Sequence, residues 1–217
     1  MDVLRSVARY LADRDPGHPL RVGIDGICGA GKSTFAVSLT AAVAATGRPA
    51  LRVDSDGFHH VRERRRRNVA DPARGYYDDA YDFDSLAEAV LRPLGPGGDR
   101  TYATRVHDLA TDAVITGEYA TAAPNAVVVF DATFLQGDVL AELWDEVVFL
   151  DADEAAATAR GIARDSDALG GAAAARVAYD ERYLAACRIY LRERDPRSRA
   201  SVVVDNTDPR HPVIVRM

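Results

Sequence analysis

A glycine-rich stretch of nine residues constrains this sequence more than any other feature. Residues 26–34 read GICGAGKST and match the pattern GxxxxGK[ST] at every fixed position. The apolar run from Leu20 to Ile24 precedes the stretch as a predicted strand, and residues 35–39 continue it as a predicted helix. Strand, glycine loop and helix form the context in which this pattern binds the phosphates of a nucleoside triphosphate. The sequence therefore predicts a triphosphate site here.

The residue types in this loop suit phosphate binding. Glycines let backbone N–H groups close around phosphate oxygens at a helix N-terminus, whose dipole favours anions. Lys32 would reach the β and γ phosphates, and the Ser33 hydroxyl would ligate Mg²⁺. Lys32 is the only lysine among 27 Lys and Arg residues, so the one compact ammonium stands where a point charge is needed. The predicted ATP-binding residues are Gly26, Gly29, Ala30, Gly31, Lys32, Ser33 and Thr34.

Length and composition favour one globular domain spanning residues 1–217. Hydrophobic residues make up 47% of the chain, which suffices for a layered core, and no apolar run approaches the ~20 residues of a membrane span. The N-terminal segment is amphipathic and lacks a signal-peptide pattern, so we expect a cytoplasmic protein without membrane contact. A formal net charge of −6 argues against general nucleic-acid binding. Cys28 and Cys187 are too few to suggest a disulfide framework or a metal cluster.

Carboxylates follow two further predicted strands. Asp54 and Asp56 come after the strand at 49–53, and Asp131 ends the β-branched run that begins at residue 126. Open α/β sheets bind their ligands at the carboxyl ends of the strands. Asp131 would serve Mg²⁺ through water, and Asp54 is a further candidate for the metal. We expect Asp56 to orient or deprotonate an acceptor hydroxyl, with Asp54 as the alternative base.

The middle of the chain offers candidate contacts for an acceptor. Five arginines lie between residues 62 and 67, on a predicted short helix. Such a run is compatible with a solvated face, with an anchor for phosphate or an anionic acceptor, or with a nucleic-acid contact. Residues 75–84 mix tyrosines with acids, and we expect a loop that offers rings and carboxylates to a polyhydroxylated or nucleoside acceptor.

A flap and a lid are expected over the site. Alternating residues at 101–107 and 113–116 predict a β-hairpin flap over about residues 100–117. A helix over 154–164 carries Arg160 and Arg164 one turn apart, and with the loop after it would form a lid over about residues 158–172. Guanidinium groups there would stabilise the charge on a transferring phosphoryl group. The turn at 206–209, after a predicted strand at 201–205, is a candidate neighbour of the adenine ring.

These elements predict the fold class. Strands that end in loops with acids and alternate with helices indicate a P-loop NTPase of the three-layer α/β/α type. We expect a mostly parallel sheet, with the small β-hairpin flap and the helical lid as additions. A long helix over 172–193 is predicted near the C-terminal end.

On these motifs the sequence resembles the uridine kinase and phosphoribulokinase-like family of P-loop kinases, which includes bacterial pantothenate kinase and nicotinamide riboside kinase. The resemblance covers most of the chain and is strongest in GIDGICGAGKST, in DGFHH at 56–60, in the Tyr102-to-His107 spacing and in ARGIARD at 159–165. It implies that Asp56 is the catalytic base. It also implies that Asp78 contacts a sugar, that Tyr102 and His107 hold a nucleobase, and that Arg160 and Arg164 are the lid arginines. The predicted acceptor-binding set is Asp56, His59, Tyr77, Asp78, Tyr102 and His107.

The leading expectation is a kinase that uses ATP and Mg²⁺ to phosphorylate a hydroxyl of a nucleoside. The chain departs from uridine kinases at Asp167–Gly171, where they usually carry a further arginine, and at His59, where they have tyrosine. Alternatives are a related kinase for pantothenate, nicotinamide riboside or a sugar phosphate, and an ATP-binding regulatory module without turnover. A conventional GTPase is disfavoured because its NKxD motif needs a lysine beyond Lys32. A homo-oligomer is an open option.

Overall fold

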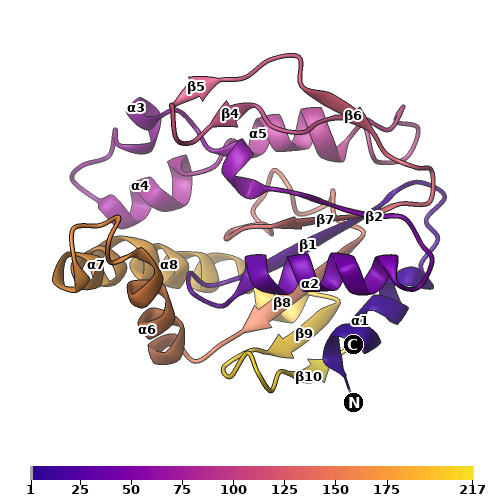
Figure 1. The fold of residues 1–217 in the computed structure, drawn as a ribbon. Coiled ribbons are helices and arrows are strands. Elements are labelled where there is room, and N and C mark those ends of the chain that lie inside the picture. The colour runs from indigo at the N-terminus through magenta and orange to yellow at the C-terminus, as the bar shows by residue number, and fades with distance from the viewer. Residues whose placement is uncertain (1) are drawn as a thin grey trace.

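The computed structural model describes residues 2–217, and a six-stranded sheet forms its centre (Figure 1). The strand order is β10-β9-β8-β1-β7-β2. Only β10 runs antiparallel to its neighbour; the other pairs in this sheet are parallel. The strands are β1 (Leu20–Gly26), β2 (Ala50–Val53), β7 (Val127–Asp131), β8 (Glu146–Asp151), β9 (Val202–Asp205) and β10 (Val213–Arg216). The mostly parallel sheet with flanking helices confirms the predicted fold class.

Continuous apolar runs explain the central strands. Every residue of β1 and of β7 is buried, as expected for parallel strands that are covered on both faces. On β7, Val127 and Val129 face one hydrophobic core, and Val128 and Phe130 face another. The first core is closed by α1 (Val3–Ala12), α2 (Lys32–Ala44) and the C-terminal helices. The second core lies under residues 83–103 and the flap.

Four helices follow β8 in the C-terminal half. They are α6 (Glu154–Asp165), α7 (Ala172–Ala178), α8 (Leu184–Arg194) and the short α9 (Pro196–Arg199). Two of them, α6 and α8, contact the glycine loop. The predicted long helix at 172–193 is present, but a turn of π-helix, η3 (Tyr179–Tyr183), interrupts it. No helix within residues 2–217 is both long enough and apolar enough to cross a membrane.

One predicted loop is wrong. Residues 75–84 are mostly helical, because α4 (Pro72–Asp79) begins upstream of them and continues through both tyrosines. Asp71 caps this helix by accepting a hydrogen bond from the backbone N–H of Arg74, and Pro72 occupies its first turn. The next segment continues as α5 (Phe83–Leu86) and a π-helical turn, η2 (Ala87–Leu91). The short helix predicted at the arginine run is α3 (Arg62–Arg65).

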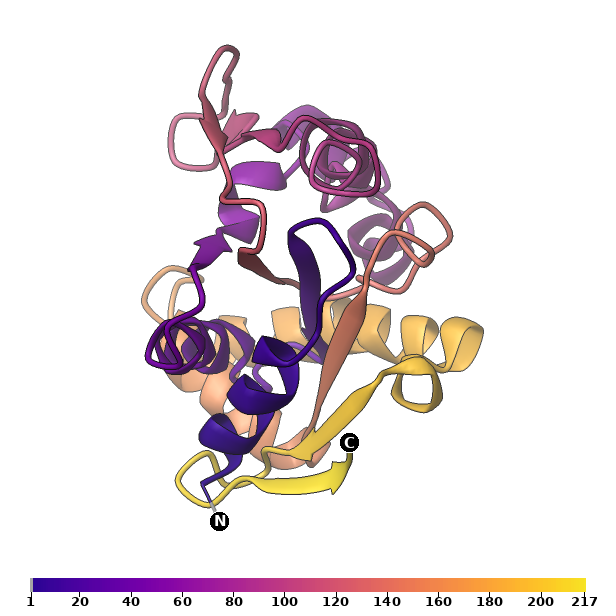
Figure 2. The ribbon, with the colours of Figure 1, turned by 90° about the vertical axis from the view of Figure 1, so that its right-hand side faces the viewer.

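The predicted hairpin is present and is longer than expected. It consists of two short antiparallel ladders, β3 (Thr101–Ala103) with β6 (Tyr119–Thr121) and β4 (His107–Asp108) with β5 (Ala113–Val114). Figures 1 and 2 show this flap at the end of the molecule opposite β10. It rests on the 3₁₀ turn η1 (Ser55–Phe58), where the backbone N–H of Val106 donates to the carbonyl of Gly57 at 2.9 Å.

Candidate active site

The glycine loop connects β1 to α2 and is held tightly between neighbouring elements. Gly31 precedes α2 with φ = 92°, in the left-handed region, and no side chain caps the helix there. The N–H groups of the first turn therefore stay available for an anion. A Cβ on Gly29 (φ = 80°) would lie 2.1 Å from the carbonyl oxygen of Ala157 on α6. Only glycine fits at this close approach, so the loop and the lid helix pack directly against each other.

The charged and hydroxyl groups of the loop already have protein partners. The Lys32 ammonium donates to the carbonyl oxygens of Gly26 at 3.0 Å and Ile27 at 2.9 Å. The Ser33 hydroxyl donates to a carboxylate oxygen of Asp131 at 2.6 Å. Asp131 ends β7, which pairs with β1, so the sheet itself brings the loop and this carboxylate together. The two residues predicted to serve Mg²⁺ thus lie within hydrogen-bond distance of each other, and their role stays a prediction.

The Ser33 and Asp131 oxygens fit the demands of Mg²⁺. Proteins usually bind Mg²⁺ through one or two side-chain oxygens, with phosphates and water completing the octahedron. Within residues 2–217 no group of three or more His, Cys, Asp or Glu side chains forms a metal cage. A shared site on Ser33, Asp131 and nucleotide phosphates requires no such cage.

The two aspartates after β2 differ in their surroundings. Asp54 caps η1 by accepting from the backbone N–H of Asp56 at 3.1 Å, and it also pairs with Arg52 at 2.9 Å. The Nε atom of Arg52 donates to a carboxylate oxygen of Asp131 at 2.6 Å. The Asp56 carboxylate accepts no hydrogen bond from the described part of the chain and lines the cavity beside the loop. Partial burial, together with the negative charges of Asp54 and Asp131, raises the pKa of Asp56 above its ordinary value of 3.8.

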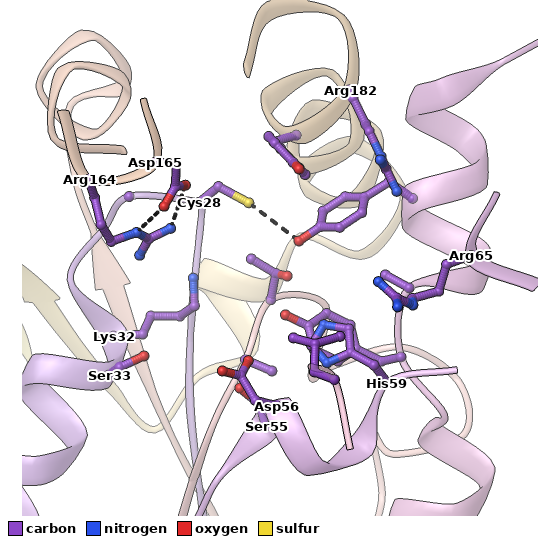
Figure 3. A pocket seen from close by; sticks show the side chains of 18 of the residues that line it. Cys28, Lys32, Ser33, Ser55, Asp56, His59, Arg65, Arg164, Asp165 and Arg182 are labelled. Atoms are coloured by element: carbon purple, nitrogen blue, oxygen red, sulfur yellow. Dashed lines mark hydrogen bonds and ion pairs between the residues drawn. The ribbon is translucent and has the colours of Figure 1, made fainter. Parts of the chain in front are cut away.

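A cavity of about 420 Å³ opens between the glycine loop, η1, α3, α4 and η3 (Figure 3). The loop and the lid contribute Cys28, Lys32, Ser33 and Arg164 to one end of it. The opposite wall carries aromatic and basic side chains, namely His59, Arg65, Arg66, Tyr76, Tyr81, Arg182 and Tyr183. Burial and the nearby charge of Arg65 lower the pKa of His59 to about 4, so its imidazole is neutral at physiological pH. Its ring packs on Tyr81 with centroids 4.4 Å apart.

The two lid arginines have different hydrogen-bond partners, and Arg164 lines two cavities. Arg164 lines the cavity and pairs with Asp165 at 2.7 Å, while Asp165 also accepts from the hydroxyl of Tyr179 at 2.7 Å. Arg160 instead donates to the carbonyl oxygens of Gly29 and Thr207, at 3.0 and 2.7 Å. It lines a second cavity of about 270 Å³, with Phe35, Asn206 and Pro209 among its walls. The turn predicted near the adenine ring therefore borders this second cavity, which shares Gly29 and Arg164 with the first.

Several residues of the predicted acceptor set lie outside the main cavity. Tyr77 and Asp78 line a separate cavity with Arg74 and Arg194, and Asp78 pairs with Arg74 at 2.8 Å. Tyr102 is packed in the second hydrophobic core. His107 is 2% exposed, hydrogen-bonds Asp112 at 3.2 Å and lines cavities on the flap side of His59.

Sequence reasoning missed several side chains that do line the main cavity. Tyr76, and not its neighbour Tyr77, faces the cavity because α4 is a helix, in which successive side chains point about 100° apart. The signal that could have located it is the cap and proline pair Asp71-Pro72. Tyr183 and Arg182 come from η3, whose π-helical turn leaves no clear pattern in the sequence.

Cys28 lies in the glycine loop, where the sequence already suggests sensitivity to alkylation, and the structure adds a partner for it. Its thiol lies 3.6 Å from the thiol of Cys187 on α8. A hydrogen bond from Cys187 and the charge of Lys32 outweigh burial and lower the pKa of Cys28 to about 7. Part of this side chain is therefore thiolate at neutral pH.

Comparisons with known proteins agree with this geometry. In the solved structures, the fold matches a possible uridine kinase from Bacillus stearothermophilus with TM-score 0.71 and 20% identity, over 92% of this chain and 96% of that chain. It matches a candidate fructose transport system kinase from Silicibacter sp. TM1040 with TM-score 0.73 and 26% identity, over 89% and 96%. D-glycerate 3-kinase from Cryptococcus neoformans matches with TM-score 0.54 and 13% identity, over 86% and 88%.

No sequence match to a curated protein was found. The family model described as "Phosphoribulokinase / Uridine kinase family" matches residues 22–178, which is more than half of the chain and includes the glycine loop, η1 and the lid helix. The phosphate loop, the strand-end acids and the kinase-like fold are thus found in one continuous matched region, and the chain belongs to the phosphoribulokinase/uridine kinase family of P-loop kinases.

Proposed function

We propose that this protein transfers the γ-phosphoryl group of ATP to a hydroxyl of a small acceptor. The observation that carries the proposal is the shared cavity, in which the unbonded carboxylate of Asp56 faces Lys32 and Ser33 (Figure 3). A base, a phosphate anchor and a metal-binding hydroxyl are the parts that such a transfer requires.

The chemistry follows from these residues. The acceptor oxygen forms a bond to the γ-phosphorus while the bond from that phosphorus to the β–γ bridging oxygen breaks, and ADP leaves with the electron pair. Asp56 accepts the hydroxyl proton and releases it to solvent. Because this base must be ionised, its raised pKa moves the acid limit of activity above the range of an ordinary aspartate.

The other residues bind and orient. Loop N–H groups and Lys32 would hold the phosphates, and Arg164 would face the equatorial oxygens of the transferring group. Ser33 and Asp131 would hold Mg²⁺, which when bound neutralises charge on the β and γ phosphates. We propose that the adenine moiety uses the second cavity beside Asn206, where Arg160 and Phe35 supply one charged and one apolar wall.

The finer proposal concerns the acceptor. A nucleoside is supported by the rings of Tyr76, Tyr81 and Tyr183 in the cavity wall, on which a base could stack. The similarity to a candidate fructose transport system kinase favours a sugar-like acceptor instead. The cytoplasmic location of the protein and a homo-oligomeric state stay predictions.

The test is acceptor-dependent release of ADP from Mg-ATP, measured over nucleosides, pantothenate, sugars and sugar phosphates. Asp56→Asn should bind ATP as the wild type does, yet lose about 10²- to 10⁴-fold in turnover, the usual contribution of a general base. Asp54→Asn is the matched control, and a larger loss there would move the base to Asp54. ATP binding without ADP release in the presence of any acceptor would identify a regulatory ATP-binding module.

A further inference from the structure

The arginines of α3 and of the two residues after it have two different kinds of partner. Arg64 and Arg67 pair with the buried Asp79 of α4, at 3.3 and 2.7 Å. Arg65 and Arg66 line the main cavity instead. The run is therefore no continuous basic stripe of the kind that follows a nucleic-acid backbone.

Arg182 adds a third guanidinium from the other side of the cavity. Its carbon Cζ lies 5.3 Å from the ring centroid of Tyr76 and 5.5 Å from that of Tyr183. These rings hold the planar group in place while leaving its N–H donors free. Neither Arg182 nor Arg66 has a carboxylate within ion-pair distance among residues 2–217, whereas Arg65 is partly neutralised by Asp112 at 3.3 Å.

The positions of these side chains define two ends of the cavity. In Figure 3, Lys32, Ser33 and Arg164 lie on one side, Arg65 and Arg182 lie on the other, and Asp56 lies between them. An acceptor whose hydroxyl meets Asp56 would extend its remaining part toward the arginines. Arg182 is half-buried and Arg66 is exposed at the edge of the cavity. A phosphate or carboxylate would pair with these guanidinium groups through two parallel hydrogen bonds, whereas a neutral acceptor would leave both without a counter-charge.

We infer that the acceptor is a small hydroxylated anion, a sugar phosphate or hydroxy acid, whose charged group binds Arg66 and Arg182, with Arg65 beside them. This inference rests on the proposed kinase activity and narrows it. The cavity of about 420 Å³ also has to admit the γ-phosphoryl end of ATP, so it suits an acceptor of few carbon atoms.

The test compares compounds that differ only in charge, with Mg-ATP at saturation: ribose with ribose 5-phosphate, and glycerol with glycerate and with glycerol 3-phosphate. The anionic member of at least one pair should have a KM at least about 10-fold lower than the neutral one, and the phosphate and carboxylate arms separate the two kinds of anion. Arg66→Gln and Arg182→Gln should each raise the KM for that anion about 10- to 100-fold, the range for a lost charge-assisted hydrogen bond, with kcat and the KM for ATP nearly unchanged.

Two further variants control for charge and folding. Arg62→Gln removes a charge from the same run outside the cavity and should leave the acceptor KM at the wild-type value. Arg182→Lys keeps the charge without the fork and should recover only part of the affinity. Equal KM values for charged and neutral partners, or no change in Arg66→Gln and Arg182→Gln, would overturn the inference.

Calorimetric binding to the protein loaded with Mg-ADP separates this inference from the proposed function. Binding of the anions that is lost in Arg66→Gln and Arg182→Gln, without ADP release by any acceptor, would uphold the anion site and reject the kinase activity. If none of the anions binds, the inference is wrong, whatever turnover the neutral compounds give.

Discussion

At the scale of single residues, the structure gives Cys28 a reactivity that its place in the glycine loop alone does not. Its thiol borders the main cavity, and its pKa of about 7 lies below the ordinary value of 9.0 because Cys187 donates a hydrogen bond to it. The reactive thiolate becomes abundant as the pH rises through about 7. Alkylation at this position would place an added group beside Lys32.

We therefore predict that iodoacetamide inactivates the enzyme with a rate that reaches half its maximum near pH 7, and that Mg-ATP slows the reaction. The measurement is residual ADP-forming activity against time at a series of pH values. Cys187→Ser should shift the midpoint, because it replaces the thiol donor. Cys28→Ser should resist the reagent, and inactivation of that variant at the wild-type rate would refute the assignment.

The site residues that could be predicted from the sequence share one property, which is that each lies next to a strand end or in a contiguous motif. The loop residues follow β1, Asp131 ends β7 and Asp56 comes shortly after β2, and parallel pairing brings such positions to one edge of the sheet. The approach of Arg182 to Tyr76 could not be predicted, because it depends on the phase of two helical segments far apart in the chain. Their roles stay predictions.

At the scale of elements, the contact between α6 and η3 sets the position of the lid. A Cβ on Gly161 would lie 2.2 Å from the hydroxyl of Tyr179, so the tyrosine ring packs directly on the backbone of α6 at this glycine. The same hydroxyl binds Asp165, the partner of Arg164. The orientation of Arg164 at the cavity thus depends on a close helix approach that only glycine permits.

We predict that Gly161→Ala displaces the lid helix and lowers kcat about 10-fold or more, because small misplacements of positioning groups are costly in transition-state stabilisation. The free energy of unfolding should fall by about 1–3 kcal/mol from overpacking. Steady-state kinetics and urea denaturation measure the two effects. Ala163→Ser, on the exposed face of the same helix, is the control; full activity in Gly161→Ala would show that lid position does not govern turnover.

The elements themselves were predicted unevenly, for physical reasons. Strands β1, β7 and β8 have continuous apolar runs next to clear turn signals. Helix α4 was missed because its tyrosines and acids have a composition typical of a loop, and the decisive Asp71-Pro72 pair lies before them. The π-helical turns depend on packing, which a single sequence does not encode locally.

At the scale of the whole molecule, one buried arginine connects the central strand β1 to the residue before β8 and to the helical segment that ends at Leu91. Arg21 of β1 is 6% exposed and binds Asp145, before β8, through Nε at 2.9 Å and Nη2 at 2.8 Å. Its third nitrogen donates to the carbonyl of Leu91 at 3.2 Å. Neither residue lines the main cavity.

We predict that Asp145→Ala lowers the free energy of unfolding by about 3–5 kcal/mol, because it leaves a buried guanidinium unpaired. Glu88→Ala removes the exposed partner of Arg92, and the loss there should be at most about 0.5 kcal/mol. Urea unfolding followed by circular dichroism compares the two. Activity per folded molecule should be unchanged in both variants, and equal destabilisation by both would contradict the buried-pair account.

The overall architecture could be predicted because hydrophobic runs and turn signals specify an alternating α/β chain. The order of the strands and the antiparallel β10 at the sheet edge could not, since many orders are compatible with the same runs. The fold class and family are confirmed. That the chain works as one domain with a moving lid stays a prediction.

The hydrogen bonds from Lys32 to the carbonyls of Gly26 and Ile27 have a consequence for the kinetics of nucleotide capture. These bonds fix the conformation of the loop in the folded protein. Its backbone therefore loses its conformational freedom during folding and not during nucleotide binding. A triphosphate then binds a preformed loop, and its association rate is limited by diffusion and orientation. Replacing Lys32 would consequently slow capture as well as weaken retention, because these hydrogen bonds and the phosphate contact belong to the same ammonium group.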